Sequence, residues 1–427
     1  MKEKLFKTTI ILLVGGLITK LLGMFIKISL ARTISPKALG LYMMILPTFN
    51  LVIQLSQLSL PLAVSKIISE GDKNSKKLYF SVIPILIITN IIVIATILLF
   101  GKVIAINFLH EEKLIPAIYS LSTVIPFITI SSICRSYFFA KQKMFPHVIS
   151  NIIENLTRLL LILLILPKLY FLSLKYKLVF LILSNIISEL TSTIILLINL
   201  PKNINIKKED LIPNKTYIKE SLSLSIPNTT DRLVGSIAYF LEPIILTKHL
   251  LKNYSKSWIT KQYGIFTGFV MPLLLLPTFF TIAISNALLP EISKDYYNKN
   301  YKTVNKKIKT SVLISFLIGL IPTLLFIIKP TIPLKLLYKT TKGKIYIRLL
   351  APICLIEYLN SPISSSLIAM GKSKECLKIS IISSTLRIIT LTILSNYKIG
   401  FISLIISISV DVITDFILGI KEINKHL

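Results

Sequence analysis

The chain has 427 residues, of which 53% are hydrophobic and 16% are charged, and its mean hydropathy is +0.75. It nevertheless carries a formal net charge of +30, because it has 49 lysines and arginines but only 19 aspartates and glutamates. A soluble domain cannot bury this much apolar surface, and a nucleic-acid-binding protein of this charge would be polar. The composition excludes a soluble enzyme, a disordered tail and a nucleic-acid partner, and indicates a protein of the lipid bilayer whose cations lie mostly in loops.

Apolar segments follow one another along the whole chain, separated by short polar turns. A membrane-spanning helix needs about 20 apolar residues. The periodicity of these segments is helical or absent, and none alternates as the strands of a membrane barrel do. We therefore expect an all-α polytopic membrane protein of about twelve transmembrane helices, at residues 8–30, 38–65, 78–101, 114–134, 145–168, 174–200, 216–247, 262–290, 310–328, 345–371, 376–397 and 399–420.

The second half of the sequence repeats the first. The segment 39–49 resembles the segment 263–273. Further along the chain, Arg158 aligns with Arg387. A single match between apolar helices is weak, but these matches occur in the same order across four helices. The repeat predicts two six-helix lobes, residues 1–214 and 215–427.

Six helices per lobe is an even number, so both lobes have the same orientation in the membrane. Their expected relation is a pseudo-two-fold axis along the membrane normal. Transporters built from such repeats bind their substrate near the midplane between the lobes and expose it to each side in turn.

The lysines and arginines also predict an orientation. Twelve helices place both termini on one side, and the segments on that side hold 25 cations whereas the opposite loops hold 18. Cytoplasmic loops carry the excess of Lys and Arg. We therefore expect a multi-pass protein of the cytoplasmic membrane with both termini in the cytoplasm.

Charged residues also fall inside the expected helices. Charges at membrane depth are costly, so they line a cavity or pair with one another. The cations are Lys20, Lys27, Arg135, Arg158, Arg232 and Arg387. The carboxylates are Glu154, Glu189, Asp231, Glu242, Glu357, Asp411 and Asp415.

The spacing of these charged residues along the chain indicates which of them share a helix face and which can form an ion pair. Lys20 and Lys27 are two helical turns apart and share one face of the first helix, where they line a cavity or reach the interface with their long stems. Glu154 and Arg158 have the i, i+4 order that favours an ion pair, which would be functional or purely structural. Arg387 needs an anion, which would be Asp411, Asp415, Glu357 or the substrate.

Together these charges predict a phosphate-binding cavity. Arg binds phosphate through two parallel hydrogen bonds, so converging cations suit a pyrophosphate-bearing lipid. The predicted phosphate clamp comprises Lys20, Lys27, Arg158, Arg232 and Arg387. The predicted coupling or structural carboxylates are Glu154, Glu189, Asp231, Glu242, Glu357 and Asp411. We expect no metal site, no cofactor and no enzymatic activity, because no spacing of metal ligands and no ATPase motif is visible.

The residues resemble the stage V sporulation protein B family, within the multidrug/oligosaccharidyl-lipid/polysaccharide exporter superfamily. The segment 132–158 resembles the family's signature in helices 4 and 5, although Ser136, Phe139 and Ala140 replace the Gly, Gln and Gly of that signature. The matching residues are Arg135, Tyr137, Phe138, Pro146, Glu154 and Arg158. Lys20, Gly23, Lys27, Gly40, Tyr42 and Pro47 match the first two helices, and Glu242 takes the place of an acidic residue usual in helix 7. Many members have fourteen helices, whereas twelve are expected here.

The resemblance implies a flippase for a lipid-linked oligosaccharide of the undecaprenyl-pyrophosphate type, in particular lipid II for spore cortex peptidoglycan, with spore-wall synthases as further partners. Two alternatives stay open. A cation-coupled multidrug exporter of the same fold would rely on the carboxylates rather than the cations. A non-transporting scaffold for spore-wall synthesis would make the charges inside the helices dispensable.

Overall fold

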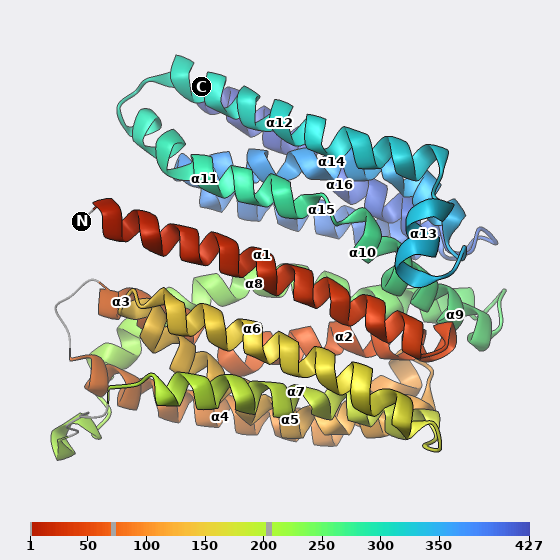
Figure 1. Ribbon diagram of the computed structural model, residues 1–427, viewed down its shortest axis with the longest axis horizontal. Helices are drawn as coiled ribbons and strands as arrows, with labels where there is room; N and C mark the ends of the chain where they lie inside the picture. The colour runs from red at the N-terminus through yellow and green to blue at the C-terminus, as the bar shows by residue number, and fades with distance from the viewer. Residues whose placement is uncertain (1, 70–73, 202–206) are drawn as a thin grey trace. The chain divides into compact units, whose positions relative to one another are not determined.

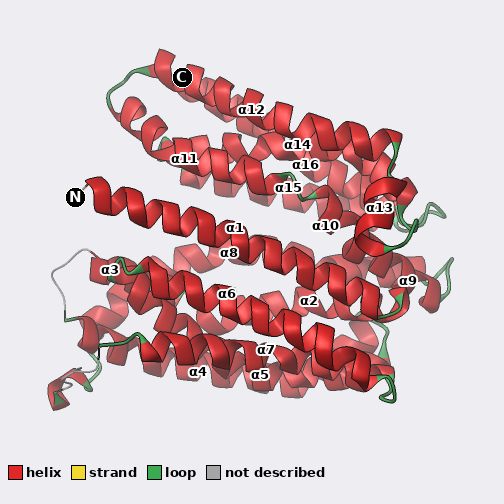
Figure 2. Ribbon diagram, in the orientation of Figure 1, coloured by secondary structure: helices red, strands yellow, loops and turns green. Residues whose placement is uncertain are grey.

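The computed structural model describes residues 2–69, 74–201 and 207–427, apart from the side chains of residues 2–10, 13 and 231. Every regular element in this part of the chain is a helix, as Figure 2 shows. The expected all-α architecture is therefore confirmed. In the first half of the chain the helices are α1 (Lys2–Thr33), α2 (Pro36–Gln57), α3 (Leu60–Ser69), α4 (Ser75–Val103), α5 (Ile115–Ala140), α6 (Met144–Leu160) and α7 (Leu174–Ile198).

The remaining helices begin after the polar segment around residue 210. They are α8 (Lys215–Leu250), α9 (Lys256–Ile265), α10 (Met271–Leu274), α11 (Thr278–Tyr297), α12 (Tyr301–Ile328), α13 (Thr331–Tyr338), α14 (Lys344–Ala369), α15 (Ser373–Leu394) and α16 (Ile402–His426). Short π-helical segments extend α4 and α6 and join α9 to α10, at Ile104–Phe108, Leu161–Ile165 and Phe266–Val270.

Ten of the described helices are long and apolar enough to cross a membrane, and the bent pair Lys256–Leu274 and Thr278–Tyr297 supplies an eleventh span. The twelfth expected span corresponds to α14, which is as long as α5 at 26 residues. It includes Lys344, Arg348 and Glu357 and is not among the helices that qualify as spans by length and composition. It nevertheless packs against α12 and α16, so it belongs to the same helical bundle.

Two of the expected spans are not continuous helices. The segment 38–65 breaks at Leu58 and Ser59, whose φ angles are 46° and 50°, and Pro61 lies in the first turn of the next helix, α3. The segment 262–290 bends by 46° before α11, whose N-cap is Pro277. A proline has no backbone N–H, and the first turn of a helix needs no intrahelical N–H donor, so Pro61 and Pro277 suit the starts of the helices that follow these breaks.

Contacts between residues divide the chain into two compact units. Unit 1 comprises Met1–Thr33 and Met44–Ile237, and unit 2 comprises Ile34–Met43 and Ala238–Leu427. Helices α2 and α8 therefore each contribute to both units. The lobe boundary expected between residues 214 and 215 stays a prediction.

Each unit contains the same arrangement of three helices. In unit 1, α7 packs against both α5 and α6, and in unit 2, α16 packs against both α14 and α15 (Figure 1). The starting residues Ile115, Met144 and Leu174 of α5, α6 and α7 precede those of α14, α15 and α16 by 229, 229 and 228 positions. The helix bounds thus agree with the repeat read from the sequence.

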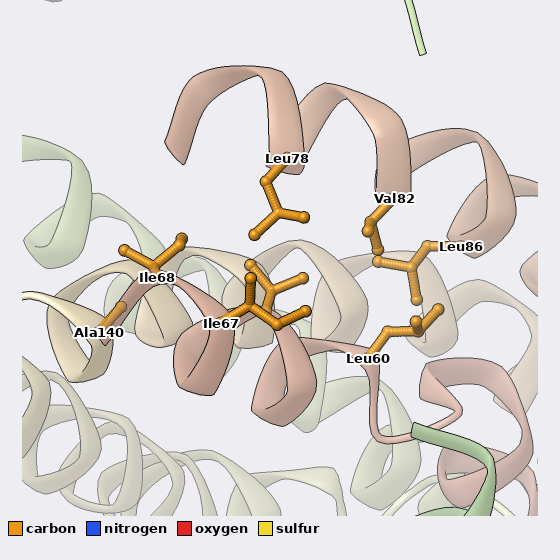
Figure 3. Close-up of a cluster of buried hydrophobic side chains, with 8 residues drawn as sticks. Leu60, Ile67, Ile68, Leu78, Val82, Leu86 and Ala140 are labelled. Carbon is orange, nitrogen blue, oxygen red and sulfur yellow. The ribbon is translucent and has the colours of Figure 1, made fainter. Parts of the chain in front are cut away.

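A cluster of buried aliphatic side chains joins α3, α4 and the end of α5 within unit 1 (Figure 3). Lipid tails are as apolar as these side chains, so packing in a membrane is driven by close van der Waals contact rather than by exclusion of water. The buried members are Leu60, Val64, Ile67, Ile68, Leu78, Val82, Leu86 and Ala140.

Two glycines allow an unusually close approach of backbones within unit 2. A Cβ atom on Gly40 of α2 would lie 1.8 Å from the carbonyl oxygen of Thr260 of α9. A Cβ atom on Gly264 of α9 would lie 2.3 Å from the carbonyl oxygen of Pro36. Small residues let membrane helices approach closely, and here any side chain would have to displace backbone.

Gly40→Ala is therefore expected to destabilise the protein by about 1–3 kcal/mol, the usual cost of forcing extra atoms into a packed contact. Thermal unfolding of the purified chain in detergent measures this as a lower melting temperature. Gly16→Ala is the matched control, because nothing lies within 4 Å of a Cβ at Gly16. Equal melting temperatures for the two variants would contradict the close approach.

Candidate functional site

A network of charged side chains joins three helices of unit 1. Arg135 of α5 donates from Nη2 to Glu154 Oε2 of α6 at 2.6 Å and to Glu189 Oε2 of α7 at 2.9 Å. The same nitrogen lies 3.0 Å from Ser192 Oγ of α7. Arg158 of α6 lies 3.5 Å from Glu154 Oε1. The network holds α5, α6 and α7 together through two cations and two carboxylates.

This network both confirms and extends the sequence-based expectation. The i, i+4 ion pair between Glu154 and Arg158 is present, but the shorter bond of Glu154 is to Arg135. From the sequence, Arg135 was expected to lie inside a helix and to belong to the family signature, but its partners were not predicted, because they lie 19 and 54 residues further along the chain. No local spacing could have revealed them.

A second network occupies unit 2. Arg387 of α15 donates from Nη2 to Glu242 Oε2 of α8 and from Nη1 to Asp411 Oδ2 of α16, the latter at 3.2 Å. Glu242 is buried and also accepts a hydrogen bond from the Tyr263 hydroxyl at 3.2 Å. Of the anions that the sequence offered for Arg387, the structure supplies Asp411, and it adds Glu242.

Further carboxylates lie around the same arginine. Glu357 of α14 interacts electrostatically with Asp411, Asp415 and Arg387, and it accepts a hydrogen bond from Asn360 Nδ2 at 3.2 Å. One oxygen of Asp415 is buried without a hydrogen-bond partner among the described residues. The two networks therefore differ in charge. Unit 1 balances two arginines with two glutamates, whereas unit 2 pairs one arginine with Glu242 and Asp411 and has Glu357 and Asp415 as additional carboxylates.

The other predicted clamp residues have exposed side chains. Lys20 and Lys27 are exposed on α1, within the apolar stretch Val14–Thr33, and Arg232 is exposed on α8. The side chain of its neighbour Asp231 lies outside the described residues.

The five predicted clamp residues are divided between the two units. Lys20, Lys27, Arg158 and Arg232 belong to unit 1, and Arg387 belongs to unit 2. Their joint role in binding phosphate stays a prediction.

The signature aromatic residues have a packing role next to the unit 1 network. Phe138 is fully buried, and its ring meets that of Tyr137 edge to face, with centroids 5.4 Å apart. Pro146 is the third residue of α6, a position that needs no intrahelical N–H donor.

An apolar groove of about 490 Å³ lies between α4 and α5 of unit 1. Asn90 and Thr129 line it and are hydrogen-bonded to each other at 3.0 Å, which satisfies polar groups on an otherwise aliphatic wall. The wall includes Ile87, Ile91 and Ile130, whose side chains are exposed.

Comparison with known families places the chain among membrane transporters. The model of the family described as "Polysaccharide biosynthesis protein" matches residues 5–296, and the model described as MatE matches residues 266–393. Stage V sporulation protein B of Bacillus subtilis (strain 168) is 29% identical over 397 residues, which cover 90% of this chain and 77% of that protein. The resemblance found in the sequence is confirmed.

More distant relatives also point to a membrane transporter. Lipid II flippase MurJ of Bacillus subtilis (strain 168) is 22% identical over 78% of this chain and 64% of its own length. Among solved structures, an inward-facing multidrug resistance MATE family transporter of the MOP superfamily has a TM-score of 0.77 at 16% identity, covering 96% of this chain and 95% of that structure. An inward closed form of MurJ has a TM-score of 0.74 at 17% identity, covering 96% and 87%. These similarities show the fold.

Replacing Arg135 with methionine is expected to destabilise the protein by about 3–5 kcal/mol, because Glu154 and Glu189 lose the cation they share in a region of low dielectric. Arg135→Met combined with Glu189→Gln leaves the Glu154–Arg158 pair and should recover much of the loss. Thermal and chemical unfolding in detergent measure both variants. Lys141→Ala, at an exposed position after α5, is the control. If the double variant were no more stable than Arg135→Met, the shared ion pair would not be the source of the stability.

Proposed function

The chain belongs to the polysaccharide biosynthesis protein family, and we propose that it is a flippase that moves a lipid-linked cell-wall or polysaccharide precursor across the cytoplasmic membrane by alternating access. It is a multi-pass membrane protein, and its relatives are transporters and flippases rather than enzymes. The excess of cations on the side of the termini, 25 against 18, supports cytoplasmic termini.

The observation that carries the proposal is the pair of exposed lysines on α1. Lys20 is 13 residues from the end of α1 at Thr33, a distance of about 20 Å along the helix, so its stem cannot easily reach that end. An ammonium group at this depth is costly unless it meets an anion or water. A diphosphate is an anion that both Lys20 and Lys27 can hold, because the two lysines are two turns apart on one face.

The other clamp residues would act in two ways. Arg232 has an exposed side chain and can bind a phosphate directly. Arg158 and Arg387 are already bound to carboxylates, so they would share their remaining donors with the substrate or exchange one anion for another. Arg135 would act through Glu154, by holding that carboxylate in place beside Arg158.

We further propose that the acidic network of unit 2 couples transport to a cation gradient. Arg387 is paired with Glu242 and Asp411, whereas Glu357 and Asp415 form no ion pair with any described residue. In a membrane such an excess of negative charge favours the uptake of protons or a small cation. Glu154 and Glu189 are balanced by arginines and would be structural. Asp231 keeps either role, because its neighbour Arg232 points in a different direction from the same helix.

The substrate that we propose is a lipid on an undecaprenyl-pyrophosphate carrier, in particular lipid II for the spore cortex, with spore-wall synthases as partners. The support is similarity to proteins named for sporulation and for lipid II flipping. The proposal needs no bound cofactor, because the driving force comes from an ion gradient, the membrane potential or consumption of the product.

Lys20→Ala and Lys27→Ala are each expected to slow translocation of lipid II in reconstituted vesicles by roughly tenfold to a hundredfold, the effect of losing a hydrogen bond to a charged group. The rate is measured from the appearance of the headgroup on the far side of the vesicle. Lys27→Arg should retain most of the rate, and Lys261→Ala, at an exposed position on α9, should retain all of it. Wild-type rates for both alanine variants would refute the clamp.

The acidic network also favours a second candidate, a cation-coupled multidrug exporter. In that case an organic cation would be transported, and Glu357→Gln and Asp411→Asn would abolish its efflux while Lys20→Ala and Lys27→Ala would not. Efflux of a fluorescent organic cation from vesicles distinguishes the two functions. Lipid II transport that depends on the lysines, with no efflux of the organic cation, is the result we expect. If every one of these variants supported normal spore-wall synthesis in cells, the scaffold alternative would be favoured instead.

A further inference from the structure

A cationic ridge runs along the first turns of α12 in unit 2. Lys302, Lys306 and Lys309 line a shallow groove of about 390 Å³, together with Asn305, Thr310 and Leu313. The spacing of the three lysines, four and three residues, places them on one face of the helix. All three side chains are exposed, and no carboxylate within the described part of unit 2 forms an ion pair with any of them.

The fourth lysine of this segment is used differently. Lys307 lies between Glu291 and Asp295 of α11, at 2.8 Å and 2.9 Å, so its charge is neutralised within the protein. Glu291 and Asp295 of α11 are thus ion-paired with Lys307 of α12. The three lysines of the ridge are left to attract an anion from outside the chain.

The ridge continues directly into an apolar surface. The next positions on the same face of α12 are Leu313 and Leu317, whose side chains are 57% and 53% exposed. The rest of α12 is one of the spans apolar enough to cross a membrane. A face that is cationic for two turns and then aliphatic matches an anionic headgroup followed by its acyl chains.

The repeated helix in unit 1 shares only the first of these lysines. The helix α4 starts at Ser75 and α12 at Tyr301, an offset of 226 residues. At this offset Lys302 corresponds to Lys76, whereas Lys306 and Lys309 correspond to Phe80 and Ile83. The two lysines are therefore not needed to build this helix of the repeat.

We propose that the ridge of Lys302, Lys306 and Lys309 is a binding site for an anionic phospholipid of the surrounding bilayer. The three ammonium groups would hold the phosphate of the headgroup, and Leu313 and Leu317 would contact the acyl chains. The predicted topology places this end of α12 at the cytoplasmic face, where clusters of lysine next to a membrane helix bind anionic lipid. The site would anchor unit 2 at the membrane surface, and it does not depend on the transported substrate.

Binding of phosphatidylglycerol to the full-length protein in neutral detergent tests the proposal, with native mass spectrometry counting the lipids retained. We expect the wild type to prefer phosphatidylglycerol to phosphatidylcholine. The triple variant Lys302→Gln, Lys306→Gln, Lys309→Gln should bind phosphatidylglycerol more weakly, by about fivefold per lysine or on the order of a hundredfold in all.

Two controls test whether lipid binding depends on these three lysines or only on the net charge of the protein. Lys307→Gln should lower the melting temperature but keep the affinity for phosphatidylglycerol, because its charge is already neutralised. A triple variant of exposed lysines elsewhere in unit 2, Lys335→Gln, Lys342→Gln, Lys344→Gln, should bind the lipid like the wild type.

Three results would overturn the proposal. The first is a ridge variant that binds phosphatidylglycerol as tightly as the wild type does. The second is a control triple variant that loses as much affinity as the ridge variant. In the third, inorganic phosphate at equal concentration displaces the lipid, which would show a site for a free anion. Because every readout is equilibrium binding of a bilayer lipid, failure here leaves the proposed transport function untouched.

Discussion

The cost of an unsatisfied polar or charged group in hydrocarbon is the constraint on which this structure depends. It explains why the described chain folds only into helices, which satisfy their own backbone groups. It also explains why the half-buried Arg135 and Arg387 have carboxylate partners on neighbouring helices. Arg135 joins three helices of unit 1, and Arg387 joins three of unit 2. The same cost applies to Lys20 and Lys27, the exposed lysines within the apolar stretch Val14–Thr33 of α1.

Local rules predicted a large part of this architecture from sequence. Apolar length located the spans, and the i, i+4 spacing predicted the Glu154–Arg158 pair. The breaks before Pro61 and Pro277 were missed because hydropathy does not register helix geometry. The partners of Arg135 could not be predicted either, since they depend on how α5, α6 and α7 pack. For Arg387, Asp411 was among the expected anions, but Glu242 was not.

The two units share an arrangement of helices but differ in where they place charge. Unit 1 contains a neutral network, and unit 2 contains an acidic one. The helix α12 carries Lys306 and Lys309 where its counterpart α4 has Phe80 and Ile83. In the proposed mechanism the two units would therefore have different roles. Unit 1 would present cations to the substrate phosphates, and unit 2 would take up the coupling cation and hold the membrane surface.

The central claim is that the α1 lysines bind the phosphates of a lipid-linked substrate. Equilibrium binding of an undecaprenyl pyrophosphate and of undecaprenol to the wild type and to a variant with both Lys20→Ala and Lys27→Ala tests it most directly. The account predicts that the wild type prefers the pyrophosphate strongly, that the variant binds it far more weakly, and that undecaprenol binds both proteins alike. Equal affinity of the two proteins for the pyrophosphate would contradict the account.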